Sequence, residues 1–413
     1  MDSPDPATSA AGPATPMAGH AAAAVPPRIL TRTLAMVFLS SFGAGTSFSL
    51  LLSVVPLYAS SIGAGGMGAG LTTSVLMAST VAAELCAPRL TSRFGYRAVM
   101  AAGLVLLGIP ALALPGSAST ATVMAVCVLR GAGFAITAVL SGALVAALVP
   151  PERRGEGLGL HGVVVGVPAV IALPLGVWLA ERIGYASVFT AGALAALAGL
   201  AAVPALPGRM PRPGSRTRVL QPLGILAGLR TPALVRPSIV FSAAAMAAGI
   251  VATFLPVALA PGFGDLAAAA LLAQAAASTL ARWWAGRHAD KNDTGRLLAP
   301  GALLTAAGVA VPALTTDPVA VVAGMALFGA GFGVAQNASL MLMFERAPAS
   351  TYGTVSAVWN LAYDAGMGLG AAAFGVLAAR TGYPAAFALT AALIPIALVF
   401  ARSPRSARGG GRV

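Results

Sequence analysis

The sequence predicts an all-α membrane protein with twelve transmembrane helices in two pseudo-symmetric six-helix bundles. Three observations predict this class: a shortage of charged residues, twelve long apolar runs, and a repeat that relates the two halves of the chain. Of the 413 residues, 58% are apolar and only 9% are charged, whereas a soluble globular protein carries about 25% charged residues. The composition therefore argues against a soluble enzyme, a nucleic-acid-binding protein and a disordered chain.

The apolar runs have the length and number of membrane-spanning helices. A bilayer core about 30 Å thick requires roughly 20 apolar residues at the helical rise, and a helix pairs its own backbone groups in lipid. Six runs precede the middle of the chain, at 34–58, 69–88, 98–116, 120–149, 157–180 and 185–206. Six more follow it, at 234–260, 266–285, 297–315, 318–344, 352–379 and 384–401.

The lysine and arginine positions predict the orientation. With a cytoplasmic N-terminus, 22 of the 25 basic residues fall in cytoplasmic segments, Arg182 and Arg380 fall outside, and Arg130 lies within a span. Topology thus explains the net charge of +13, and we expect no nucleic-acid partner. The predicted organisation is a disordered cytoplasmic tail (1–27), an N-terminal six-helix bundle (28–206), a basic cytoplasmic linker (207–233), a C-terminal six-helix bundle (234–402) and a cytoplasmic tail (403–413).

A repeat at a fixed offset of 198 residues relates the two bundles. Without a gap, 129–189 and 327–387 share 15 identities in 61 positions, including matched Pro, Arg, Tyr and Phe residues that a bias towards Ala and Gly does not explain. Two parallel six-helix repeats joined by a basic loop are typical of a transporter.

Two loops carry a shared basic pattern, Pro88-Arg89-Leu90-Thr91-Ser92-Arg93-Phe94-Gly95-Tyr96-Arg97 and Gly286-Arg287-His288-Ala289-Asp290-Lys291. With the twelve-helix layout, they resemble the major facilitator superfamily over about residues 30–402. The resemblance implies the major facilitator fold and a conformational latch, in which a loop acid pairs with arginines and helix ends. The candidate latch residues are Arg89, Ser92, Arg93, Gly95, Arg97, Gly286, Asp290 and Lys291. Ser92 replaces the family's acid; the alternative for both loops is a solvated basic turn.

Arg130 is the sharpest single candidate. An arginine deep in a spanning helix costs at least about 2.5–3.5 kcal/mol, so it should face a partner or a wet cavity. Its position resembles that of the fourth-helix arginine implicated in proton transfer in proton-coupled exporters of the family. The alternative is an arginine that extends to the outer membrane surface.

Two acids inside spans are candidates for proton coupling. Asp364 lies near the middle of its helix, one turn after Asn360 on the same face. A carboxyl group at this depth can carry a proton, or it can be a structural acid bonded to a neighbouring helix. Glu84 lies one turn before Pro88, near the cytoplasmic end, where a gate or latch acid is the alternative to a direct proton role.

Further candidates depend more on residue type than on charge. Gly162, Gly166, Pro174 and Gly176 resemble the Gly/Pro-rich fifth-helix motif of antiporters, although a kinked, closely packed helix explains them equally well. Gln336, Asn337, Trp359 and Asn360 are candidates for the substrate cavity, and interhelical hydrogen bonds are their alternative role.

Together these features predict a secondary transporter that exports small organic compounds, drug-like molecules among them, by proton antiport with alternating access. The alternatives are an uptake or facilitated-diffusion carrier and, in another class, a membrane scaffold or sensor without transport. We expect a monomer in the plasma (inner) membrane whose partners are lipid, protons and a small-molecule substrate. Without a phosphate-binding loop or a metal-ligand pattern, we expect no enzyme activity, cofactor or metal.

The basic-residue count predicts that both termini and residues 207–233 face the cytoplasm. Reporter fusions at Gly214 and at the C-terminus should both give a cytoplasmic signal. A periplasmic signal at either position would contradict the twelve-helix assignment, because one missing span switches the side of every later loop.

Overall fold

The computed structural model describes residues 30–150, 153–209, 227–259, 263–289, 295–315, 317–348 and 351–401. These residues form helices and turns without a strand, and the predicted all-α class is confirmed. The helices of the first half are α1 (Arg32–Leu52), α2 (Val54–Ala59), α3 (Gly65–Phe94), α4 (Tyr96–Gly108), α5 (Thr120–Leu148), α6 (Arg154–Ile183) and α7 (Tyr185–Ala198). Short π and 3₁₀ segments follow α2, α4 and α7, at Ser60–Ala64, Ile109–Ala113 and Gly199–Ala205.

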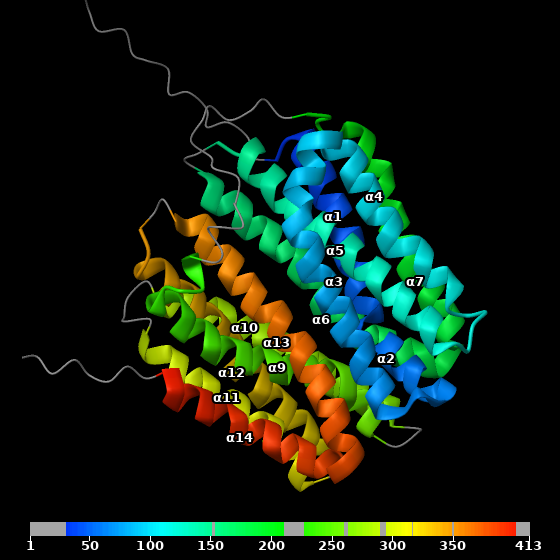
Figure 1. Ribbon diagram of the computed structural model, residues 1–413, viewed down its shortest axis with the longest axis vertical. Coiled ribbons are helices and arrows are strands. Elements are labelled where there is room, and N and C mark those ends of the chain that lie inside the picture. The colour runs from blue at the N-terminus through cyan, green and yellow to red at the C-terminus, as the bar shows by residue number, and fades with distance from the viewer. Residues whose placement is uncertain are drawn as a thin grey trace, which may run out of the picture.

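The second half repeats this pattern. Its helices are α9 (Pro232–Ala258), α10 (Gly264–Ala289), α11 (Gly295–Leu314), α12 (Pro318–Glu345), α13 (Tyr352–Thr381) and α14 (Tyr383–Ala401). Figure 1 shows the two halves as separate groups of helices, with α3 and α6 of the first half on the side of α13 and α10. The tails and the middle of the linker lie outside the described residues.

Eleven helical segments of the described chain are long and apolar enough to cross a membrane. The first, Arg32–Phe94, has 63 residues, and such a helix would be about 95 Å long, roughly three times the hydrocarbon thickness. It is interrupted at Gly63 and Gly65, whose φ angles of 93° and 61° suit glycine. Because α2 packs back against α3, this segment contributes two crossings and brings the number of spans to twelve.

The repeat is visible in the packing as well as in the sequence. A Cβ atom on Gly131 of α5 would lie 2.2 Å from the carbonyl oxygen of Leu76 on α3. At the equivalent place in the second half, a Cβ atom on Gly329 would lie 2.1 Å from the carbonyl oxygen of Gln274. Both members of the contact are shifted by the same 198 residues, so each half uses glycine at the same point to bring two helix backbones together.

The bundle has two distinct ends. We call the end where α1 and α9 begin and α14 ends the linker end, and the opposite end, which carries Gly184 and Gly382, the hairpin end. The halves meet through α3 with α13, α3 with α9, α2 with α9 and α6 with α10. Three polar contacts join them from the hairpin end to the middle: Arg182 Nη2 to Asp265 Oδ1 (3.2 Å), Thr73 Oγ1 to Thr253 Oγ1 (2.7 Å), and Ser74 Oγ donating to the Gly368 carbonyl (2.6 Å).

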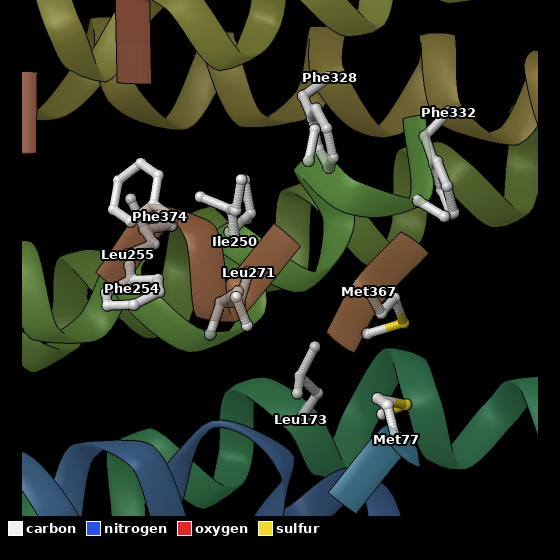
Figure 2. Close-up of a cluster of buried hydrophobic side chains, with 14 of the residues drawn as sticks. Met77, Leu173, Ile250, Phe254, Leu255, Leu271, Phe328, Phe332, Met367 and Phe374 are labelled. Carbon is white, nitrogen blue, oxygen red and sulfur yellow. The ribbon is translucent and has the colours of Figure 1, made fainter. Parts of the chain in front are cut away.

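Buried apolar side chains fill the space around these contacts. Met77 on α3 and Met367 on α13 point towards one another in Figure 2, with Leu173 of α6 on the first-half side. Both methionines are at most 3% exposed. Methionine adapts to irregular gaps, which suits a surface between two bodies that pack together.

Two glycines of α6 separate close packing from open space. A Cβ atom on Gly176 would lie 2.1 Å from the Leu50 carbonyl oxygen of α1, whereas one on Gly166 would have nothing within 4 Å. We expect Gly176→Ala to lower the free energy of unfolding by about 1–3 kcal/mol through overpacking. Gly166→Ala should leave it unchanged or slightly raised. Thermal unfolding of the purified variants in one detergent measures both; equal losses would contradict this assignment.

Candidate functional site

Arg130 is fully enclosed in the first half. Its side chain is 2% exposed, and its guanidinium donates to the Leu107 carbonyl of α4 at 2.7 Å and to the Ser47 carbonyl of α1 at 3.1 Å. No described carboxylate lies within 4.0 Å of it. The alternative of an arginine extending to the membrane surface is therefore wrong, because the charge is held inside by three helices.

A small cavity lies beside Arg130, between α1, α2, α3 and α5. Its volume is about 10 Å³, room for about one water molecule. Most of its lining is apolar, and its polar lining residues are Thr72, Thr73 and Arg130. Thr73 also bonds to Thr253 of the second half, so the cavity lies between the buried arginine and a residue at the surface where the halves meet.

Asp364 and Glu84 come together across the two halves. Asp364 on α13 is 7% exposed and Glu84 on α3 is half-buried, and the two carboxyl groups are close enough to interact electrostatically. Within the described residues, neither carboxyl group makes a hydrogen bond or an ion pair. Among the described residues, Asp364 thus has no bond to a neighbouring helix, and its proton role stays a prediction.

An aromatic wall stands beside Asp364. Trp359 stacks on Phe241 of α9 with centroids 4.6 Å apart and planes 8° apart, and Tyr363 lies nearly parallel at 6.3 Å from Trp359. The Trp359 Nε1 donates to the Ser339 hydroxyl of α12 at 3.1 Å. The stacking and this hydrogen bond thus fix the orientation of the Trp359 ring.

The three amide candidates have different surroundings. Asn360 is exposed, one turn before Asp364, whereas Gln336 accepts a 3.0 Å hydrogen bond from Arg282 of α10. Asn337 faces α10 near Gly286, and its buried Oδ1 lacks a hydrogen-bond partner among the described residues. Only Asn360 therefore shares the immediate environment of Asp364; Gln336 and Asn337 belong to the contact between α10 and α12.

The first candidate latch is bound within its own half. Gly95 turns the chain with φ 83°, the Tyr96 amide donates to the Gly208 carbonyl at 3.0 Å, and the Arg97 Nε donates to the Leu206 carbonyl. Ser92 donates to the carbonyl of Arg89, and the guanidinium of Arg93 lies over Phe94 at 5.2 Å. In this conformation the loop holds the start of the linker. Asp290 and Lys291 of the second loop lie outside the described residues.

The fifth-helix motif divides in two. Gly176, about two turns after Pro168, packs against α1, while Cβ atoms on Gly162 and Gly166 would meet nothing within 4 Å. Pro174 lies inside the continuous helix α6. The hairpin-end part of the motif thus packs helices closely, and the linker-end part leaves a smooth, unfilled helix surface.

The sequence identified candidate residues by their charge but did not identify the side chains that contact them or that join the two halves. The aromatic ring of Phe241, the hydroxyl of Ser74 and the ion pair of Arg182 with Asp265 were not singled out as functional. The charge of Arg182 and its equivalence to Arg380 in the repeat could have indicated the ion pair with Asp265. The described chain contains no group of three or more His, Cys, Asp or Glu residues able to hold a metal ion.

Twelve spans, an internal repeat and sparse polar groups at the junction of two bundles define a multi-pass membrane transporter. The family model of the Major Facilitator Superfamily matches residues 37–371, and the chain belongs to that superfamily. Its family and fold are those of transporters of small solutes and not of enzymes.

Solved structures share the fold at low sequence identity. A D-xylose–proton symporter aligns with a TM-score of 0.73 and 14% identity over 90% of this chain and 96% of that one. A D323A mutant of the nucleoside transporter NupG aligns with a TM-score of 0.71 and 14% identity, over 89% of this chain and 98% of that chain. A bacterial homologue of the human lysosomal transporter Spinster, in an inward-facing conformation, aligns with a TM-score of 0.70 and 15% identity. This alignment covers 89% of this chain and 94% of that chain.

Relatives in sequence match a shorter segment. An uncharacterised MFS-type transporter of Burkholderia mallei is 37% identical over 103 residues, which are 24% of this chain and 23% of the relative. The purine ribonucleoside efflux pump NepI of Shigella dysenteriae is 36% identical over 95 residues, 22% of this chain and 24% of the relative. The aligned part thus spans about a quarter of the length of the relatives it matches.

The bonds of Arg130 predict how its variants behave. Arg130→Ala loses both carbonyl contacts and the charge, so we expect it to lose almost all coupled transport. Arg130→Lys keeps the positive charge but loses the planar guanidinium group, so it should retain part of the coupled transport. Transport by vesicles with equal amounts of each variant in the membrane measures the difference. Normal coupled transport by well-expressed Arg130→Ala would remove Arg130 from the mechanism.

Proposed function

We propose that this protein exports small organic compounds by proton antiport, with alternating access between its two halves. The observation that supports this most is the pair of carboxyl groups, Glu84 and Asp364, which make no hydrogen bond to any described residue and lie on helices where the halves meet. A carboxyl group in such surroundings exchanges a proton without breaking a structural bond. The match to a purine ribonucleoside efflux pump supports the direction of transport.

The arrangement of the halves supports alternating access. The described contacts between them run from the hairpin end to the middle, while the linker-end part of α6 presents glycines to open space. We place both termini and the linker in the cytoplasm of a cell with an inner membrane, on the basis of the arginine and lysine distribution. With this orientation the linker end faces the cytoplasm, and the conformation is inward-facing. We also propose that the protein acts as a monomer.

The latch loops take part at another stage of the cycle. In the described conformation Gly95 and Arg97 hold the linker start of their own half. We assign contact with the second half to the outward-facing state, in which the linker end closes. Asp290 and Lys291 would serve the second loop in the same way.

Asp364→Asn tests the proton role. The amide keeps the size of the side chain but does not release a proton near neutral pH, so we expect loss of transport driven by a pH gradient and retention of downhill exchange. Everted vesicles loaded with a pH-sensitive dye and challenged with a panel of compounds report both activities. Acidification of the vesicle lumen on substrate addition, in place of proton release from the vesicles, would indicate a symporter that takes its substrate up.

Glu181→Gln is the matched control, because Glu181 is an exposed carboxyl residue at the hairpin end, away from the pair. It should transport as the unmodified protein does. Unchanged uphill transport by Asp364→Asn would exclude Asp364 as the proton carrier and return it to a structural role.

A further inference from the structure

A second cavity lies inside the second half, at the linker end. Its volume is about 260 Å³, and the helices around it are α9, α11, α12 and α14. Figure 1 shows α11 and α14 on the side of the second half that is turned away from the first half. None of the described lining residues comes from α3 or α13, the helices that carry Glu84 and Asp364. The cavity is therefore separate from the carboxyl pair.

Two arginines and the start of a helix make this cavity electropositive. Arg236 of α9 and Arg346, which directly follows α12, both line it. Gly295, the first residue of α11, lines it as well, and the free amide groups at a helix start favour an anion. Glu345 precedes Arg346 in the chain but is not among the lining residues. The described lining thus supplies positive charge and no carboxylate.

The lining changes from charged to apolar within one helical turn. Val240 lies four residues deeper than Arg236 on α9, and Leu342 lies four residues deeper than Arg346 on α12. Four residues are about one turn, and one turn is about 5.4 Å along the axis. Val240 and Leu342 are both buried. The cavity therefore suits a ligand that carries an anionic group next to an apolar part.

The internal repeat shows that this cavity is particular to the second half. At the offset of 198 residues, Arg236 corresponds to Phe38 and Arg346 corresponds to Leu148. Phe38 is buried in an apolar cluster with Leu144, and Leu148 packs against the same cluster. The first half thus fills this place with apolar side chains, whereas the second half has a cavity with two guanidinium groups. An arginine anywhere at the linker end would satisfy the orientation rule, so topology alone does not explain this placement.

We propose that this cavity binds the phosphate group of an anionic phospholipid, with Arg236 and Arg346 as the residues that hold it. A guanidinium matches two phosphate oxygens with parallel N–H donors. It has five such donors, so it can hold a phosphate while it keeps a contact within the protein. The inference concerns a resident lipid, and it depends neither on the direction of transport nor on the coupled ion.

The position of the cavity indicates why the occupant is a lipid. The ends of membrane-spanning helices lie at the depth of the phospholipid headgroups, and basic pockets between such helices bind anionic headgroups. Beside the cavity, α14 exposes Val399 and Phe400, which are 64% and 79% exposed. These side chains offer an apolar surface to the acyl chains of a lipid whose phosphate lies between the arginines. A phosphate held by both arginines would join α9 to the end of α12.

Native mass spectrometry of the delipidated full-length protein, titrated with phosphatidylglycerol, tests this site. We expect one lipid to bind more tightly than the rest, and phosphatidylcholine to bind more weakly because its choline cation offsets the phosphate charge. Arg236→Gln and Arg346→Gln should each raise the apparent Kd of the first lipid about fivefold, the effect of one basic residue near an anionic headgroup. Arg32→Gln is the matched control, because it removes an exposed arginine at the linker end of the first half. It should bind the lipid as the unmodified protein does.

A double variant, Arg236→Phe with Arg346→Leu, separates loss of the site from loss of folding. It introduces the residues that the first half has at these positions, so we expect it to elute as a single species and to lose the tight lipid. Glycerol 3-phosphate distinguishes a lipid from a soluble phosphate ester, and it should not displace the bound lipid at millimolar concentration. Equal binding of the two lipids, unchanged binding in both glutamine variants, or displacement by glycerol 3-phosphate would each overturn the proposal.

Discussion

Contact between helix backbones at glycine is the constraint on which this structure depends. Apolar side chains gain little by leaving lipid for protein, so helices in a membrane associate through close packing and hydrogen bonds. Gly131 against Leu76 and Gly329 against Gln274 bring α3 to α5 and α10 to α12 within backbone contact. The same device joins the halves at Gly70. One kind of contact thus packs the helices within each half and also joins the two halves near the hairpin end.

The sequence predicted the fold well because the membrane leaves few choices. The expected spans agree with the helices within a few residues, as 120–149 does with Thr120–Leu148, since length, apolarity and helix are linked in a bilayer. The functional candidates were found by their charge, which is rare inside a span. Their partners were not, because the pairing of Glu84 with Asp364 depends on the packing of α3 against α13. Helical periodicity within one span does not specify which distant helix it will face.

The two parts of α6 show how one helix can serve both stability and movement. Around Gly176 the helix is locked against the Leu50 backbone of α1. Around Gly162 and Gly166 it carries no side chain that would prevent another helix from approaching. A glycine surface that is unfilled in one conformation costs conformational entropy without a packing gain there. If the halves move as proposed, this unfilled surface would let another helix approach the linker-end half of α6.

The intramembrane charges differ in whether hydrogen bonds from the surrounding helices satisfy them. Arg130 is deeply buried, and two backbone carbonyls occupy its donors, so it ties α1, α4 and α5 into one body. Among the described residues, Glu84 and Asp364 make no such bonds, although an unpartnered polar group in a low-dielectric interior is costly. The two acids lie on separate halves, on the packed helices α3 and α13, and they interact electrostatically. A change in the separation of the halves would alter this interaction, whereas it would leave the bonds of Arg130 intact, because those bonds all lie within the first half.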